Sequence, residues 1–254
     1  TLVDLEAVTS TDIEYFLSYL SHYTYDGKEH VCNERAKARK LSSVRAMFKY
    51  FFNKDLISVD NAAKVHTPKL HDKPIIRLDT SEVFDIIETA ESGQGLSPHQ
   101  KAYHEKTKVR DGAILTLFLG TGIRISELVG LNNNDINFKD NSFIVTRKGG
   151  GKSILYFDDI VAEALKRYMD YKEFNQLVSP ALFLSKDTNR ITVRAVENLV
   201  QKYAKIVSPL KKISPHKLRS TYGTSLYRAT GDIYIVADVL GHKDVNTTRK
   251  HYAA

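Results

Sequence analysis

Apolar residues at steps of three and four along most of the chain predict a mainly helical protein. One such pattern follows the N-capping candidates Thr9–Asp12, and a second extends from about Asn33 to Phe52 with its apolar residues on one face. Glycine and proline separate most of the later patterns, and no internal repeat or low-complexity tract occurs. The later helices are predicted from about Thr80, at Ala113–Phe118, Ile123–Leu131, 159–173 and 192–206, after Pro215, and at Ile233–Leu240.

The apolar spacing changes to two in a single region, residues 135–159, which predicts β-strands. The glycine-rich run 147–152 lies between the second and third strands and predicts a hairpin turn that can approach a partner closely. It lacks the spacing and the following helix of a Walker phosphate loop. The expected fold is therefore mainly α with a small antiparallel β-sheet in the C-terminal domain. The predicted strands are Ile136–Phe138, Ser142–Thr146 and Ser153–Phe157.

A proline-containing segment divides the chain. His66–Pro74 carries two prolines, several basic or imidazole side chains and little that could be buried, which predicts an extended linker. We therefore expect a helical domain at residues 1–67, a linker at 68–75 and a second domain at 76–254. The polar segment Glu91–Lys108 contains glycines and a proline and predicts a surface loop, whose two histidines do not form a metal-ligand set.

The composition indicates an intracellular protein with a polyanionic partner. A formal net charge of +7 and a pI of about 9.2 favour such a partner. The single Cys32 excludes an intrachain disulfide, and no apolar run approaches the roughly 20 residues that span a bilayer. With no signal segment at the start, a cytoplasmic location is expected. The chain begins at Thr1 instead of Met, which is consistent with a piece of a longer parent protein.

Positive charge is concentrated around the second predicted helix. Residues 28–54 hold eight Lys or Arg and two acidic residues, a local net charge of +6. A solvated helix face is the ordinary interpretation of such a run, but a single sign of charge in a basic protein favours contact with the phosphates of a nucleic acid. Such contacts supply affinity and position but no sequence readout. The contact candidates, on the face opposite the apolar one, are Arg35, Arg39, Arg45 and Lys49.

Arg124 follows the break formed by Gly120 and Gly122 and stands at the start of a helix. Backbone N–H groups point outward at a helix start, so an arginine there is well placed to bind an anion. An ion pair with Glu127, three residues later, is the equally supported alternative. In the hairpin turn, Lys148 and Lys152 fit a phosphate contact, although an exposed basic turn is the simpler interpretation.

Four side chains that suit anion chemistry, His216, Arg219, His242 and Tyr252, occur near the C-terminus with few carboxylates around them. His216 and Arg219 are three residues apart at a helix start, so we expect both on one face. Donors and positive charge suit an anion whose charge grows as it reacts, and a phosphodiester is the common biological case. Tyr252 is then a candidate nucleophile. Each residue alone is more often structural, and the set is what favours catalysis.

Four motifs occur together in order: Thr121-Gly-Ile-Arg124-Ile-Ser-Glu127-Leu, His216-Lys-Leu-Arg219, Leu240-Gly-His242 and Tyr252. Jointly they closely resemble the tyrosine recombinase, or phage integrase, family, and the similarity covers about residues 4–254. The joint motif is highly specific, whereas the His-x-x-Arg pair alone is weak. Within the family the chain is most similar to Xer-type recombinases and to integrases of mobile elements in Firmicutes.

The resemblance implies a site-specific recombinase that cleaves and rejoins DNA strands through a 3′-phosphotyrosyl intermediate, without metal, ATP or another cofactor. It implies that Tyr252 attacks phosphorus and that Lys148 protonates the departing 5′ oxygen, with Lys152 the less favoured candidate for that step. The residues implied to hold the scissile phosphate are Arg124, Arg219, His216 and His242, with Glu127 orienting Arg124 or its neighbours.

The resemblance also implies a helical core-binding domain and a catalytic domain that grip double-stranded DNA. It implies that four copies of the chain act on two sites, and it allows accessory DNA-bending proteins as further partners. Tyr252 lies ten residues after His242, where many Xer-like members have nine. Two alternatives stay open: a type IB topoisomerase, and a DNA-binding regulator that has lost cleavage. The sequence does not reveal the target site or the choice between integration, excision and chromosome resolution.

Overall fold

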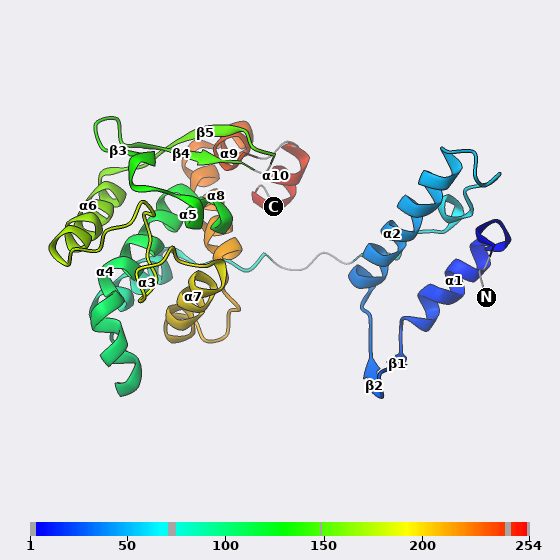
Figure 1. Ribbon diagram of the computed structural model, residues 1–254, viewed down its shortest axis with the longest axis horizontal. Coiled ribbons are helices and arrows are strands. Elements are labelled where there is room, and N and C mark those ends of the chain that lie inside the picture. The colour runs from blue at the N-terminus through cyan, green and yellow to red at the C-terminus, as the bar shows by residue number, and fades with distance from the viewer. Residues whose placement is uncertain (1–3, 71–74, 148, 242–244, 253–254) are drawn as a thin grey trace. The chain divides into compact units, whose positions relative to one another are not determined.

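The chain divides into two compact units, Thr1–Pro74 and Ile75–Ala254, each with its own hydrophobic core. The border falls inside the segment 68–75 that the prolines predicted as a linker. Separate cores are what independently folding domains have. The structure is a computed structural model and is drawn in Figure 1. The residues it describes are 4–70, 75–147, 149–241 and 245–252.

The first unit is built on two helices whose apolar faces share one core with Ala62 and Val65, with Leu41 and Phe48 fully enclosed. Helix α1 begins with a capping box, in which Thr9 and Asp12 each bond the other's backbone N–H. Helix α2 begins at Asn33, whose side chain caps it. The elements are η1 (Leu5–Ala7), α1 (Ser10–Tyr19), β1 (Tyr23–Tyr25), β2 (Lys28–His30), α2 (Glu34–Phe52) and η2 (Asn61–Lys64).

The β1–β2 hairpin is an element that the apolar spacing did not predict. Asp26 and Gly27 form its turn at φ values of 52° and 69°, as the mirror-image turn of a tight hairpin requires. Tyr23 pairs with His30 across the strands, and their rings stack with centroids 5.3 Å apart. An Asp-Gly pair favours such a turn, but strands of three residues are too short to show alternation.

The second unit packs its helices around α4, which contacts α3, α6 and α8 (Figure 1). Residues 111–118 of α4 are all buried, so this half of the helix forms the centre of the core. Among the described residues, no helix has the length and apolar character needed to cross a membrane. The helices are α3 (Thr80–Ser92), α4 (Pro98–Thr121), α5 (Ile125–Gly130), η3 (Asn133–Asp135), α6 (Asp159–Phe174), α7 (Val193–Val207), α8 (Pro215–Thr230), α9 (Ile233–Leu240) and α10 (Val245–Tyr252).

Three antiparallel strands in the order β3-β4-β5 form the sheet of this unit. Phe143, Val145 and Leu155 point into the core from alternate positions, as the period of two requires. The predicted fold class, mainly α with a small antiparallel sheet, is confirmed. The strands are β3 (Ile136–Asn137), β4 (Ser142–Thr146) and β5 (Lys152–Tyr156).

The prediction of a surface loop over Glu91–Lys108 was wrong for most of its length, because α4 already begins at Pro98. Ser97 caps the helix in a capping box, and proline is well suited to the first helical position. The buried residues of this first half are polar: His104, for example, is 1% exposed, with its Nε2 2.8 Å from the carbonyl oxygen of Ala90. Polar buried positions leave no apolar period to detect.

Candidate active site

Arg124 and Glu127 are joined at the start of α5. Arg124 is the N-cap residue; its backbone N–H donates to Glu127 Oε2 at 3.0 Å and its Nη1 donates to Oε1 at 2.9 Å. The Glu127 side chain is 2% exposed and that of Arg124 is 27% exposed. The ion pair considered from the sequence is therefore present, but its carboxylate is buried and its guanidinium still reaches the surface. The pair can hold Arg124 in place while leaving it open to an anion.

Arg219 lies on α8, inside the protein, with 5% of its surface exposed. Its guanidinium donates to the carbonyl oxygens of Gly122 and Leu240. Burial first, and the charge of Arg124 second, lower the pKa of Arg219 to about 10, so it stays charged at neutral pH. His216, one turn earlier on α8, is exposed instead of buried. The two residues expected on one face thus differ in depth.

The C-terminal end of α9 binds three arginines through three consecutive backbone carbonyl groups. Helix ends leave such carbonyls without intrahelical partners, and the helix dipole favours positive charge there. The three arginines stand directly after β4, on α8 and at the start of α5, so this helix end gathers positive charge from separate parts of the unit. The pairs are Arg147 with Val239, Arg219 with Leu240, and Arg124 with Gly241.

Tyr252 ends α10 and is 6% exposed. Its ring packs against Gly223, one turn after Arg219 on α8, where an added Cβ would lie 2.5 Å from Cε1 of the ring. Burial raises the pKa of Tyr252 above its usual value, while Arg219, a hydrogen bond with Ser220 and Arg124 act in the opposite direction. The phenol is therefore neutral at neutral pH and lies within the field of both arginines.

The turn between β4 and β5 is closed by two backbone hydrogen bonds. Arg147 N–H donates to Gly151 O at 2.7 Å, and Gly150 N–H donates to Arg147 O at 3.0 Å. Gly149 and Gly150 have φ values of 102° and 87°, which other residues rarely adopt. Lys152 is exposed at the start of β5. Two further candidates, Lys148 and His242, lie outside the described residues.

Arg147 is a residue of this region that the sequence reasoning missed. Its Nη1 donates to both carboxylate oxygens of Glu127, at 3.1 and 3.2 Å. Glu127 therefore holds two arginines, one local and one 20 residues away. No periodic signal in the sequence marks this contact, and the interpretation of the turn rested on the neighbouring Lys148. An arginine ending a strand beside a glycine-rich turn was the only available hint.

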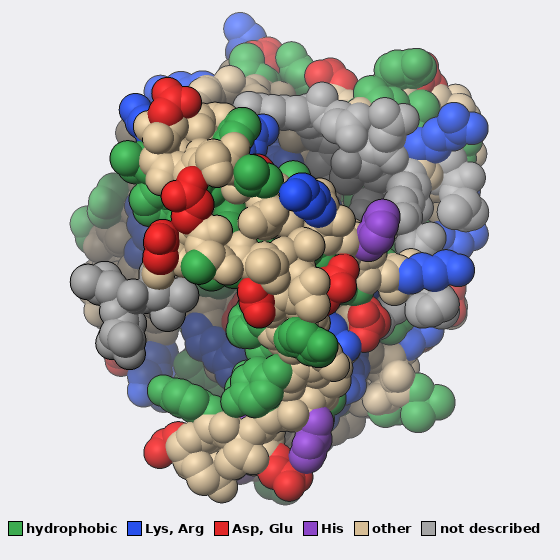
Figure 2. Space-filling view, turned by 90° about the vertical axis from the view of Figure 1, so that its right-hand side faces the viewer, with side chains coloured by type: hydrophobic (Ala, Val, Ile, Leu, Met, Phe, Trp, Pro, Cys, Tyr) green, Lys and Arg blue, Asp and Glu red, His purple; other side chains and the backbone are tan. Residues whose placement is uncertain are grey.

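Three of the four predicted DNA-contact residues on α2, namely Arg35, Arg39 and Lys49, are exposed. Arg45 instead holds the end of the first unit: Nη1 donates to Thr67 Oγ1 at 2.8 Å, Nε to the carbonyl of Ala62 at 3.3 Å, and Nη2 to that of Val65. The structure thus gives Arg45 an internal role. Figure 2 shows charges of both signs, mixed with hydrophobic side chains, on the face that it draws, so positive charge does not cover that face evenly.

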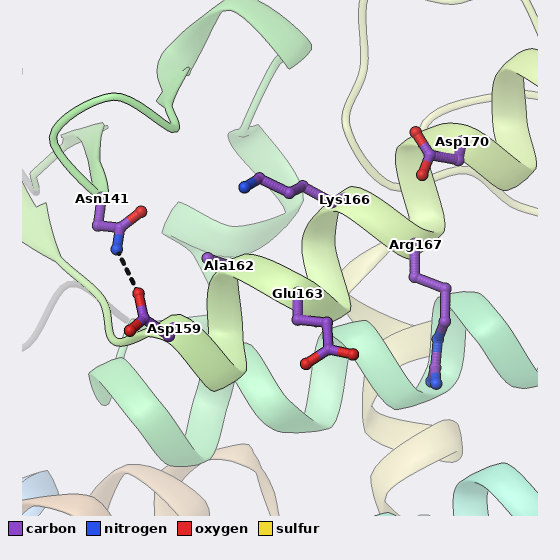
Figure 3. A pocket seen from close by; sticks show the side chains of 7 residues that line it. All are labelled: Asn141, Asp159, Ala162, Glu163, Lys166, Arg167 and Asp170. Atoms are coloured by element: carbon purple, nitrogen blue, oxygen red, sulfur yellow. Dashed lines mark hydrogen bonds between the residues drawn. The ribbon is translucent and has the colours of Figure 1, made fainter.

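A surface pocket of about 500 Å³ lies along α6 and contains none of the candidate residues. Figure 3 shows its side chains, among them Asn141, which donates to Asp159 Oδ1 at 3.0 Å. The candidate site is instead a group of cationic side chains around helix ends, which suits a large anionic substrate better than a small enclosed one. Within the described ranges, no three His, Cys, Asp or Glu side chains are grouped so that they could hold a metal ion.

Comparison with known families gives a match to the phage integrase family over residues 76–254. The tyrosine recombinase XerC of Thermodesulfovibrio yellowstonii is 33% identical over 218 residues, covering 84% of this chain and 69% of that protein. The XerC of Caldanaerobacter subterraneus is 33% identical over 251 residues, covering 97% of this chain and 66% of that protein. The chain thus spans about two thirds of the length of these curated relatives.

Solved structures with the same fold include recombinases and a transposon integrase. The XerH site-specific recombinase bound to palindromic difH substrate has a TM-score of 0.76 at 18% identity, covering 98% of this chain and 67% of that one. The Tn1549 transposon integrase in complex with a circular intermediate DNA has a TM-score of 0.74 at 18% identity, covering 98% and 82%. At this identity the likeness establishes the fold alone. Together with the curated relatives it confirms the predicted Xer-type resemblance, and the chain belongs to the phage integrase family of tyrosine recombinases, enzymes of DNA strand exchange.

Proposed function

We propose that the chain cleaves and rejoins DNA at a specific site, with Tyr252 as the nucleophile. The observation that carries this proposal is the packing of the Tyr252 ring, from the end of α10, against Gly223 of α8. Gly223 lies one helical turn after the buried Arg219, and Tyr252 is within the field of Arg219 and Arg124. A phenol beside two fixed guanidinium groups fits attack on a phosphodiester, because the negative charge on phosphorus oxygens grows during attack.

In the proposed cleavage step, the phenolic oxygen of Tyr252 bonds to phosphorus as the bond from phosphorus to the 5′ oxygen breaks. The phenolic proton leaves to a base, and the 5′ oxygen takes up a proton. Arg124 and Arg219 bind the two non-bridging oxygens. A guanidinium has five N–H donors, so Arg124 can keep its one backbone carbonyl partner, and Arg219 its two, and still bind phosphate. Losing one such donor typically costs on the order of 10²–10³ in rate.

We assign the proton transfers to lysine and histidine side chains. We assign protonation of the 5′ oxygen to Lys148, with the exposed Lys152 as the less favoured candidate. His216, exposed on α8, and His242, which follows Gly241, would complete the phosphate contacts and assist the transfers. Glu127 would orient Arg124 through the bonds described above.

The covalent 3′-phosphotyrosyl bond keeps the energy of the broken phosphodiester, so a second 5′ hydroxyl can reseal the strand without ATP. Fixed arginines supply the charge stabilisation that a metal ion would otherwise give, and we propose that the reaction needs none. Exchange between two duplexes needs four active tyrosines, which we assign to a homotetramer on two sites. Accessory DNA-bending proteins, a mobile-element origin and a cytoplasmic location stay predictions.

The first unit would hold the duplex beside the cleavage site. Arg35, Arg39 and Lys49, all exposed on α2, would contact backbone phosphates, which gives affinity that falls with salt concentration. Relatives of the same fold were solved with recombination-site DNA, which supports a duplex partner. Replacing all three residues by alanine should weaken duplex binding in a gel-shift titration, and unchanged affinity would sink this assignment.

The cleavage proposal is tested on a denaturing gel with a pool of labelled, nicked duplexes in the presence of EDTA. Wild-type protein should give a slower, SDS-resistant and protease-sensitive band, and Tyr252→Phe should give none. The trapped DNA, once sequenced, supplies the target site. Relaxation of supercoiled DNA without joined products would favour a type IB topoisomerase, and binding without any covalent band would favour a regulator.

A further inference from the structure

Arg147 has partners that tie the β4–β5 turn to the candidate active site. Its side chain is 14% exposed. Nη1 donates to both oxygens of Glu127, and Nη2 donates to the carbonyl of Val239 at 3.2 Å. Burying a guanidinium is unfavourable unless a carboxylate and further acceptors receive its donors. Arg147 has both, from two elements that are distant from it in sequence.

Gly241 connects Arg147 to Arg124 a second time. A Cβ added to Gly241 would lie 2.9 Å from Cζ and 3.1 Å from Nε of Arg147, so the guanidinium lies against the glycine backbone. Gly241 O accepts from Arg124 Nη2 at 2.9 Å. The two arginines therefore share two partners, the Glu127 carboxylate and the backbone of Gly241.

One donor of Arg147 remains unmet. Its Nε is buried, and no acceptor for it is found among the described residues. A buried donor without an acceptor is uncommon and costs stability. An arginine that served folding alone would stabilise the protein more without this unmet donor. A group that must hold two neighbours in a given geometry can keep the donor despite its cost in stability.

We propose that Arg147 is a positioning residue for strand cleavage, which sets Arg124 through Glu127 and Gly241. This inference rests on the proposed function of the site. With Arg147 present, Glu127 is shared between two guanidinium groups and cannot neutralise Arg124 alone. Without it, the carboxylate turns to Arg124 only, and Gly241 loses the group packed against its backbone. Arg124 then binds phosphate less strongly and in a less fixed orientation.

The test compares two substrates built on the recovered target site, one with the ordinary scissile phosphate and one with an uncharged methylphosphonate in its place. Single-turnover cleavage at saturating protein removes differences in binding. Arg147→Met should slow cleavage of the charged substrate on the order of 10²-fold, because the arginine clamp is impaired. It should slow the uncharged substrate by less than about tenfold, since that substrate has less charge to stabilise. Arg147→Lys should recover only part of the rate, because one ammonium group cannot replace the planar fork.

Arg110 provides a matched control in the same unit. Its side chain is 12% exposed, pairs with a carboxylate that is 1% exposed, and donates from Nη1 to the carbonyl of Leu184 at 2.8 Å. Arg110→Met should lower the unfolding midpoint at least as much as Arg147→Met does, yet slow both substrates by the same small factor.

The Arg147 proposal is overturned if Arg147→Met cleaves the charged substrate within about threefold of wild type, or if it slows both substrates equally. Gly241→Ala is a second variant, because its Cβ would push against the Arg147 guanidinium; it should show the same preference for the uncharged substrate, and equal slowing of both would also count against the proposal. If the wild type forms no covalent product that depends on Tyr252, the proposed function itself fails, and this inference with it.

Discussion

Two buried carboxylates in the second unit, Asp111 and Glu127, are each surrounded by cations but serve different ends. Asp111 is 1% exposed, and its oxygens accept from Arg110, Lys202 and Tyr203. These partners belong to α4 and α7, and the Lys202 ammonium lies 4.0 Å from the Tyr203 ring centroid. The hydrogen bonds from Lys202 and Tyr203 to Asp111 link α7 to α4.

The Glu127 side chain is buried to a similar extent, but one of its partners reaches the surface. Arg124 keeps 27% of its side chain exposed, and Arg219 adds a further positive charge nearby. Each carboxylate has two cationic partners, Arg110 and Lys202 for Asp111 and Arg124 and Arg147 for Glu127. Arg219 is a third cation near Glu127, so the excess of positive charge is larger there, at a helix end. Burial and pairing alone therefore do not distinguish the cluster around Asp111 from the proposed functional one around Glu127; the remaining exposure and the excess charge do.

The largest expected effect is on the cleavage rate, which should depend on the cluster around Glu127 and not on the one around Asp111. Arg124→Met should lower single-turnover cleavage of the target site by about 10²–10³-fold, because a fixed phosphate donor is lost. Its unfolding free energy should change less than that of an Asp111 variant, since Glu127 keeps Arg147 as a partner. A wild-type cleavage rate in Arg124→Met would contradict the assignment of this cluster to catalysis.

The same comparison is tested from the other side by Asp111→Asn. Removing the charge leaves Arg110 and Lys202 without their carboxylate and should lower the unfolding free energy by about 3–5 kcal/mol. The cleavage rate per folded molecule should stay near wild type, measured at a temperature where the variant is folded. A selective loss of cleavage with full stability would show that the two clusters are not separate in role.

Gly223→Ala tests the packing of Tyr252. The new Cβ would meet Cε1 and Cζ of the ring at 2.5 and 2.8 Å, so the ring must move, at a cost of about 1–3 kcal/mol. Nitration of Tyr252 by tetranitromethane, followed by peptide mass spectrometry, should rise. Gly130→Ala is the control, because no side chain of the described residues beyond its chain neighbours lies within 4 Å of its added Cβ. Equal nitration in both variants would argue against the observed packing.

The smallest effect concerns pH. Burial raises the pKa of Tyr168 to about 12, from 10.0. Because the folded-state pKa is the higher one, the stabilisation is present below about pH 10 and is lost as pH rises to about 12, up to about 3 kcal/mol. Urea unfolding of Tyr168→Phe should depend less on pH than the wild type in this window. Parallel curves for the two proteins would contradict the pKa shift.

Local contacts explain what the sequence could predict. The capping boxes, the short strands and the link between Arg124 and Glu127 all join residues three or four apart or alternate with a period of two. The two arginines with unforeseen internal partners, Arg45 and Arg147, make contacts 17 to 22 and 20 to 92 residues away, for which no periodic signal exists. The first half of α4 was missed because its buried residues are polar.

The candidate site shows the same limit. Arg124, Arg219 and Tyr252 could be selected as a set from the order and type of residues, and the structure brings the two arginines to one helix end with Tyr252 within their field. The sequence could not show that three successive carbonyls of α9 bind three arginines, because the folded positions of β4, α5 and α8 decide that. Side-chain type suggested the chemistry, and tertiary packing decided the geometry.

The most direct test of the account is to identify the residue that carries the DNA after covalent trapping. The complex formed on a nicked duplex would be digested with protease and nuclease, and the nucleotide-bearing peptide sequenced by mass spectrometry. The account predicts a 3′-nucleotide on Tyr252. A nucleotide on any other residue of the chain, or a linkage through a 5′ phosphate, would contradict it.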